Sequence, residues 1–142
     1  MIESVASRGR FGRGLLGSSG RLKLLRAAPE VDAAGAVFES MLAGWRDQQL
    51  ARNLNLATIE ARERVVRRFR SHGDVWPWQW LPGHLSAWVA DMRTVDHHAH
   101  STVRSYELAV GSFCEYTCDP AYGWEEVCLA SFGSAPPAST PE

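Results

Sequence analysis

Apolar side chains recur at intervals of three and four residues along most of this chain, the spacing that places them on one face of an α-helix. The first such stretch runs from Gly35 to about Arg52 and is broken by the run Asn53-Leu54-Asn55. Its apolar positions are Phe38, Met41, Leu42 and Trp45. We therefore expect one amphipathic helix over this segment.

The second expected helix begins at Thr58, a residue type that caps helix amino termini well, with Glu60 in its first turn. Its apolar face consists of Ile59, Val66 and Phe69. A helical projection places on the opposite side the arginines Arg64, Arg67 and Arg68. Gly73 and the tryptophan-rich segment after it should end this helix, which thus separates a core face from a basic face.

Two more long helices are expected. One runs from Pro82, which suits a first turn, to about Thr94. Its apolar stripe consists of Leu85, Trp88, Val89 and Met92. After the polar loop "DHHAH", Ser101 should cap a fourth and longest helix that Asp119-Pro120 terminates. The inner face of that helix consists of Val103, Tyr106, Val110, Phe113, Cys114 and Thr117. Its outer face carries Ser101, Arg104, Ser105 and Ser112.

The run "WEEVCLASF" indicates a short last helix, and no stretch shows an internal repeat or the apolar alternation of a strand. The predicted class is all-α, a bundle of four main helices plus a short C-terminal helix. At 142 residues the chain can build one modest core. We expect one helical domain at residues 35–133, between a disordered basic tail at 1–34 and a disordered end at 134–142 with nothing to pack against.

The segment Val75–Trp80, "VWPWQW", contains three of the six tryptophans. One interpretation is a stacking platform beside a cationic groove, as in proteins that bind single-stranded nucleic acid. The other, which we favour, is a hydrophobic plug at the junction of the second and third helices, where two prolines stiffen the turn. In that case at least Trp78 is inserted between helices, with Trp88 as a packing partner.

Charge is segregated along the chain although the net charge is only −1. Residues 1–26 carry a net charge of +5 and residues 45–70 carry +4, whereas residues 71–142 carry −7. This asymmetry predicts a local anionic partner. Every basic residue except Lys23 is an arginine, so a phosphate contact would be made by a guanidinium group.

The chain has no run of about eighteen apolar residues, so we expect no membrane span and a soluble, cytoplasmic protein. Cys114, Cys118 and Cys128 form an odd set without a secretory signal, which argues against a disulfide framework. The basic tail has two further interpretations, an Arg/Ser-rich targeting peptide or an extension from a misplaced start codon.

Motifs for catalysis and metal binding are weak. The run "GRGLLG" lacks the spacing and the preceding strand of a phosphate loop, and no serine has a nucleophile-elbow context. Three histidines and two cysteines have the right chemistry for zinc: His97, His98, His100, Cys114 and Cys118. The fourth helix would hold the two groups about 20 Å apart, because it rises about 1.5 Å per residue. We therefore expect no metal and no cofactor.

Four runs follow one another along the chain: "MLAGWRDQQLARNLNLATIEARERVVRRF", "WPWQWLPGHLSAWV", "STVRSYELAVGSFCEYTCDPAYGWEEVC" and "FGSAP". This pattern resembles the N-terminal core-binding domain of tyrosine recombinases of the phage-integrase family, in the form common in actinobacterial integrases. The resemblance covers about 100 of the 142 residues and rests on the order of its motifs, since no single one is diagnostic.

The resemblance implies a SAM-like helical bundle that grips one face of a recombination half-site in double-stranded DNA. In that family the second and fourth helices face the major groove. Carried onto this chain, the implied DNA-binding residues are Arg64, Arg67, Arg68, Ser101, Thr102, Arg104 and Ser105. Arginine forks, hydroxyl groups and a helix start are suited to phosphates and base edges, which agrees with the outward faces found from the spacing.

In the family, a catalytic domain with a His-x-x-Arg box and a tyrosine nucleophile follows "FGSAP". This sequence contains no His-x-x-Arg, and its tyrosines Tyr106, Tyr116 and Tyr122 all lie in the helical domain. We therefore expect DNA binding in integration or recombination without cleavage, by a truncated or split integrase or by a free-standing binder. Two alternatives stay open: a protein-interaction module that associates with an intact recombinase or its subunits, and an inert truncated product.

Overall fold

The computed structural model describes residues 30–137, and the remainder of the expected basic tail and the last five residues lie outside this range. The described residues form five α-helices and two short 3-10 turns, with no strand among them. In chain order these are α3 (Glu30–Ala51), α4 (Leu56–Gly73), η2 (Pro77–Gln79), α5 (Pro82–Thr94), α6 (His100–Cys118), η3 (Pro120–Tyr122) and α7 (Trp124–Phe132). The predicted all-α class, with four main helices and a short last one, is confirmed.

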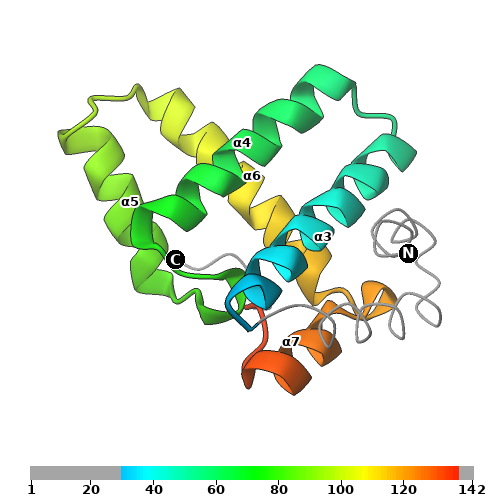
Figure 1. Cartoon of the computed structure of the whole chain (residues 1–142). Helices are drawn as coiled ribbons and strands as arrows, with labels where there is room; N and C mark the ends of the chain where they lie inside the picture. The colour runs from blue at the N-terminus through cyan, green and yellow to red at the C-terminus, as the bar shows by residue number, and fades with distance from the viewer. Residues whose placement is uncertain (1–29, 138–142) are drawn as a thin grey trace.

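Two helical hairpins build the bundle. Helices α3 and α4 form one, α5 and α6 form the other, and α4 crosses α6 near the middle of both helices (Figure 1). This crossing is the most extensive contact between elements, and α7 packs against α6. No described helix combines the length and apolar character needed to cross a membrane.

Three helix starts differ from the sequence-based expectation. The α3 helix begins at Glu30, so residues 30–34 belong to it and not to the tail. The N-cap of α4 is Asn55, because its side chain accepts a hydrogen bond from the backbone N–H of Thr58. The N-cap of α6 is Ala99 and not Ser101. Side-chain capping preference therefore located α4 to within a turn, but it failed for α6, whose cap makes no side-chain hydrogen bond.

The core depends on one close approach between helices. Gly44 of α3 lies against the side chain of Tyr116 on α6, and a Cβ atom at this position would collide with the tyrosine hydroxyl. That hydroxyl accepts a hydrogen bond of 2.9 Å from Nε1 of Trp124, the first residue of α7. Gly44 thus allows α3, α6 and α7 to meet around one buried polar contact.

The tryptophan segment is a plug, as expected. Trp78 and Trp80 are buried, and the Trp78 ring stacks on Phe132 of α7 with 4.2 Å between ring centroids. The expected pairing of Trp78 with Trp88 is wrong, since the aromatic neighbours of Trp88 are Phe69 and Tyr106. The side chains of Trp78 and Trp80 diverge, so Trp78 stacks on Trp76 and Phe132 while Trp80 contacts Phe69.

The segment after α7 also packs, contrary to expectation. The Ser134 hydroxyl donates a hydrogen bond of 2.6 Å to the Trp78 carbonyl, and Pro136 is buried. Residues 134–137 therefore cover the tryptophan plug.

Candidate nucleic-acid interface

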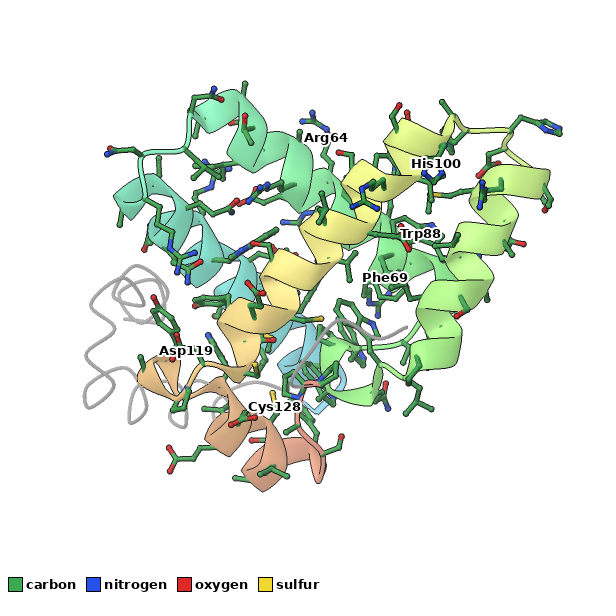
Figure 2. All side chains as sticks on the ribbon, turned by 180° about the vertical axis from the view of Figure 1, so that it is seen from behind. Arg64, Phe69, Trp88, His100, Asp119 and Cys128 are labelled. Carbon is green, nitrogen blue, oxygen red and sulfur yellow. The ribbon has the colours of Figure 1, made fainter. Side chains whose placement is uncertain are left out.

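The outward side of α4 presents Arg64 at the helix crossing. Arg64 is exposed and makes no hydrogen bond or ion pair with any residue that the structure describes. In Figure 2 it lies on α4 close to the point where α6 passes, and His100 marks the start of α6 along the same upper edge. Arg64 and the start of α6 thus lie along the same edge of the bundle in this view.

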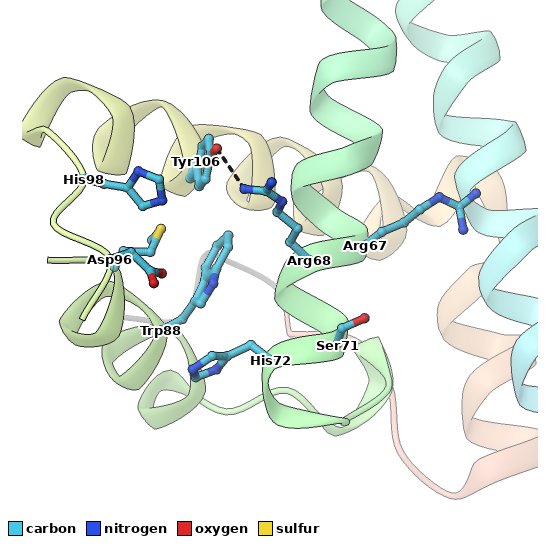
Figure 3. Close-up of a pocket in the computed structure, with 9 residues that line it drawn as sticks. Arg67, Arg68, Ser71, His72, Trp88, Asp96, His98 and Tyr106 are labelled. Carbon is cyan, nitrogen blue, oxygen red and sulfur yellow. Dashed lines mark hydrogen bonds between the residues drawn. The ribbon is translucent and has the colours of Figure 1, made fainter. Parts of the chain in front are cut away.

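Arg67 has a different environment, one that its sequence neighbourhood did not reveal. Its guanidinium donates two hydrogen bonds, of 2.6 and 2.8 Å, to the two carboxylate oxygens of Glu39 on α3. The hydrogen bonds that Arg67 donates to Glu39 lower the pKa of Glu39 and raise the pKa of Arg67. Figure 3 shows Arg67 extending towards α3, away from Arg68. A carboxylate therefore neutralises this charge within the bundle.

Two further contacts join α3 to α4 along the same seam. Arg46 donates two hydrogen bonds of 3.0 Å each to Glu63, and Arg62 donates one of 3.2 Å to Gln49. The hydrogen bonds with Glu63 raise the pKa of Arg46. These contacts and the Arg67–Glu39 pair follow the register of an antiparallel hairpin. We call this set of contacts the α3–α4 seam.

Arg68 points to the opposite side, into a groove between α4, α5 and α6. Its Nη1 donates a hydrogen bond of 3.2 Å to the Tyr106 hydroxyl (Figure 3). The Tyr106 ring stacks on Trp88 with 5.8 Å between centroids, and His98 packs against it at 5.9 Å. The groove is lined by Arg67, Arg68, Ser71, His72, Trp88, Met92, Asp96, His98 and Tyr106. We call it the Arg68 groove.

The last turn of α4 is held by its own contacts. His72 lies 2.7 Å from a carboxylate oxygen of Asp91 on α5. The Arg70 guanidinium lies over the Trp76 ring, 3.7 Å from its centroid, and donates to Asp74. The carboxyl end of α4 is thereby fixed to α5 and to the tryptophan plug.

The first turns of α6 carry the second group of predicted site residues. Ser101, Arg104 and Ser105 are exposed and Thr102 is half-buried. Arg104 has no ion-pair partner in the part of the chain that the structure describes. Because Ala99 offers no side-chain acceptor, the N–H groups of His100 and Ser101 stay uncapped within the described residues, whereas those of Thr102 and Val103 donate to the Ala99 carbonyl. The start of α6 thus combines hydroxyls, one arginine and uncapped backbone donors.

Charge over the whole bundle does not favour an anion. Residues 30–137 contain nine arginines and fourteen acidic residues, a formal charge of −5. An anionic partner would therefore depend on local placement: Arg64, Arg68 and Arg104 have no carboxylate partner within the described residues, whereas Arg46 and Arg67 are neutralised.

Chemistry of other kinds has little support in the described residues. They contain no cluster of three or more histidine, cysteine or acidic side chains that could hold a metal ion. Burial raises the pKa of both Cys114 and Cys128 to about 12, and the pKa of Cys118 is raised as well. These thiols are protonated at neutral pH and are poor nucleophiles.

The residues that the sequence reasoning missed are Glu39 and Tyr106 as partners of arginines. Glu39 and Arg46 are seven residues apart, which places them on one side of α3, and their partners Arg67 and Glu63 are four residues apart on α4. The sequence signal that could have predicted these ion pairs was the presence of complementary charges at these spacings on two consecutive helices. Nothing in the spacing indicated the Tyr106 contact, because it depends on how α4 and α6 cross.

Comparison of this chain with protein-family models, with curated proteins and with solved structures gives no match.

Proposed function

We propose that this protein binds double-stranded DNA through α4 and the start of α6, in the manner of a SAM-like core-binding domain of a phage-integrase-type tyrosine recombinase. In this proposal the described bundle binds a recombination half-site and does not cleave a DNA strand. The observation that supports this most directly is that Arg64 is exposed where α4 meets α6 and has no partner among the described residues, whereas Arg67, one turn away, is paired with Glu39.

The proposed contacts divide by chemistry. Arg64, Arg68 and Arg104 neutralise backbone phosphates, and Ser101, Thr102 and Ser105 donate hydrogen bonds to the backbone or to base edges. Arg67, which the resemblance also implied, is committed to Glu39 and contributes little in this proposal. Three phosphate contacts predict that the logarithm of affinity falls with the logarithm of salt concentration with a slope of roughly −3.

The experiment compares two arginines one turn apart on α4. Fluorescence anisotropy with a labelled duplex, at several salt concentrations, is expected to show a severalfold weaker affinity for Arg64→Ala and a salt slope shallower by about one. The matched control is Arg67→Ala, for which the affinity should change by less than about twofold because this charge is already neutralised. Equal losses for both variants, or none for either, would contradict the proposed surface.

A second candidate is a protein-interaction module. The observation that favours it is the exposure of large apolar side chains, among them Leu108 on the outer side of α6 and Leu129 on α7. Single exposed apolar residues are common on monomeric proteins, so this support is weaker. Size-exclusion chromatography with and without duplex DNA separates the candidates, because only an interaction module should self-associate or capture an intact recombinase without DNA.

A further inference from the structure

We propose that the Tyr106 hydroxyl and the Arg68 guanidinium form one composite site for a phosphate oxygen of the DNA backbone. This inference rests on the proposed function and adds to it a residue, Tyr106, whose role there is binding and not packing alone. It also assigns the Arg68 groove to one strand of the duplex.

The geometry of the pair leaves donors on both partners. Tyr106 accepts a hydrogen bond of 3.2 Å from Nη1 of Arg68. Its own hydroxyl hydrogen has no acceptor among the residues that the structure describes, and a guanidinium has five N–H donors, of which this contact uses one. Both groups face the same groove (Figure 3). A phosphate oxygen placed there can accept from both.

The charge state of Arg68 distinguishes it from Arg67. Arg67 is paired with a carboxylate, whereas the partner of Arg68 is a neutral hydroxyl, so the positive charge is retained. A hydroxyl that accepts a hydrogen bond from a cation is polarised and becomes a better donor, because hydrogen bonds in a chain strengthen one another. The Arg68–Tyr106 pair should therefore bind a phosphate oxygen more strongly than an exposed arginine alone.

The aromatic floor of the groove fixes the pair before DNA arrives. The Tyr106 ring is held between Trp88, which is buried, and His98. Ordering a long arginine side chain on binding has an entropic cost, and the contact with a fixed tyrosine reduces it. Among the described residues that line the groove, the one carboxylate is that of Asp96, on the opposite wall in Figure 3, and the lining residue His72 is paired with Asp91.

The test is a double-mutant cycle on duplex binding with Tyr106→Phe and Arg68→Ala. Tyr106→Phe keeps the ring and its stacking, and its affinity should fall about fivefold, because a hydrogen bond to a charged acceptor is lost. Arg68→Ala should lower affinity about tenfold and make the salt slope shallower by about one. If the two act as one site, Tyr106→Phe has little further effect in the Arg68→Ala background.

A matched control is Tyr122→Phe, which removes the hydroxyl of another half-buried tyrosine, one that contacts Gln48 far from the groove. Its affinity should stay within about twofold of the unchanged chain, and urea unfolding should show all three variants folded. Unchanged binding by Tyr106→Phe, or an equal loss in both Arg68 backgrounds, would overturn this inference. If Arg64→Ala weakens binding in the same assay, the proposed function survives that result. If the unchanged chain does not bind duplex DNA, both are overturned.

Discussion

The two sides of α4 use the same residue type for different purposes. On the α3–α4 seam, Arg46, Arg62 and Arg67 each contact a carboxylate or an amide of the paired helix. Towards α6, Arg64 is unpaired among the described residues and Arg68 contacts only a hydroxyl. An arginine-rich helix is therefore not by itself a basic surface, because the neighbouring element decides which charges remain.

The difference has a simple electrostatic basis. A bidentate carboxylate cancels the charge of a guanidinium at close range and occupies the donors that would otherwise meet a phosphate. A tyrosine hydroxyl cancels no charge and occupies one donor. The seam therefore contributes to stability and orientation, whereas the crossing retains the groups that can attract an anion.

The largest expected effect on stability comes from the tryptophan plug, which holds α4 in place against the neighbouring helices. Trp78→Ala removes a buried ring that stacks on Phe132, and it should lower the free energy of unfolding by about 3–5 kcal/mol. Urea denaturation followed by tryptophan fluorescence measures this loss. A Trp78→Ala protein of normal stability that no longer binds DNA would show instead that the tryptophan segment is itself a binding platform.

A smaller effect is expected from the better-buried pair of the seam. The Glu63 side chain is only 14% exposed, and Glu63→Gln leaves the Arg46 guanidinium with only the more distant carboxylate of Glu60, 4.0 Å away. We expect a loss of about 1–2 kcal/mol in the free energy of unfolding, measured by urea denaturation. Affinity for duplex DNA should not fall, because no proposed contact is removed. A clear loss of affinity at unchanged stability would show that the α3–α4 seam also takes part in DNA binding, contrary to this distinction between the two sides of α4.

The smallest effect is expected at Glu39, whose side chain is 58% exposed. Because Arg67 holds the pKa of Glu39 below its ordinary value of 4.5, the pair stabilises the fold above that value. This stabilisation is lost as the pH falls through the lowered pKa. Glu39→Gln should abolish it, at a cost of less than about 1 kcal/mol at neutral pH.

The same substitution, Glu39→Gln, also tests whether the seam pair keeps Arg67 from contributing to DNA binding. Glu39→Gln releases the charge of Arg67, so duplex affinity should rise about twofold to threefold and the salt slope should steepen. The measurements are urea denaturation at neutral and acidic pH and anisotropy with labelled duplex. Weaker DNA binding by Glu39→Gln would show that the seam pair does not mask Arg67.

Much of the fold could be predicted from the spacing of apolar residues. The positions of α5 and α7 and the carboxyl end of α4 agree with it, because buried stripes and helix-breaking residues act locally. The start of α6 was misplaced, since a cap without a side-chain hydrogen bond leaves no clear signal, and α3 begins earlier than expected, at Glu30. The pairing of Trp78 with Phe132 joins residues far apart in the chain, so no local pattern could indicate it.

For the candidate site, the residue order alone is enough to show which arginines lie away from the apolar face of each helix. Helical periodicity is enough for that, since each residue turns the direction of its side chain by a fixed angle. Which of these arginines keep their charge depends on how the helices pack. Arg67 lies within reach of Glu39 because α3 and α4 run antiparallel, and Arg68 meets Tyr106 because α4 crosses α6. Coulomb interactions and hydrogen bonds depend on distance in space, which separation along the chain does not fix.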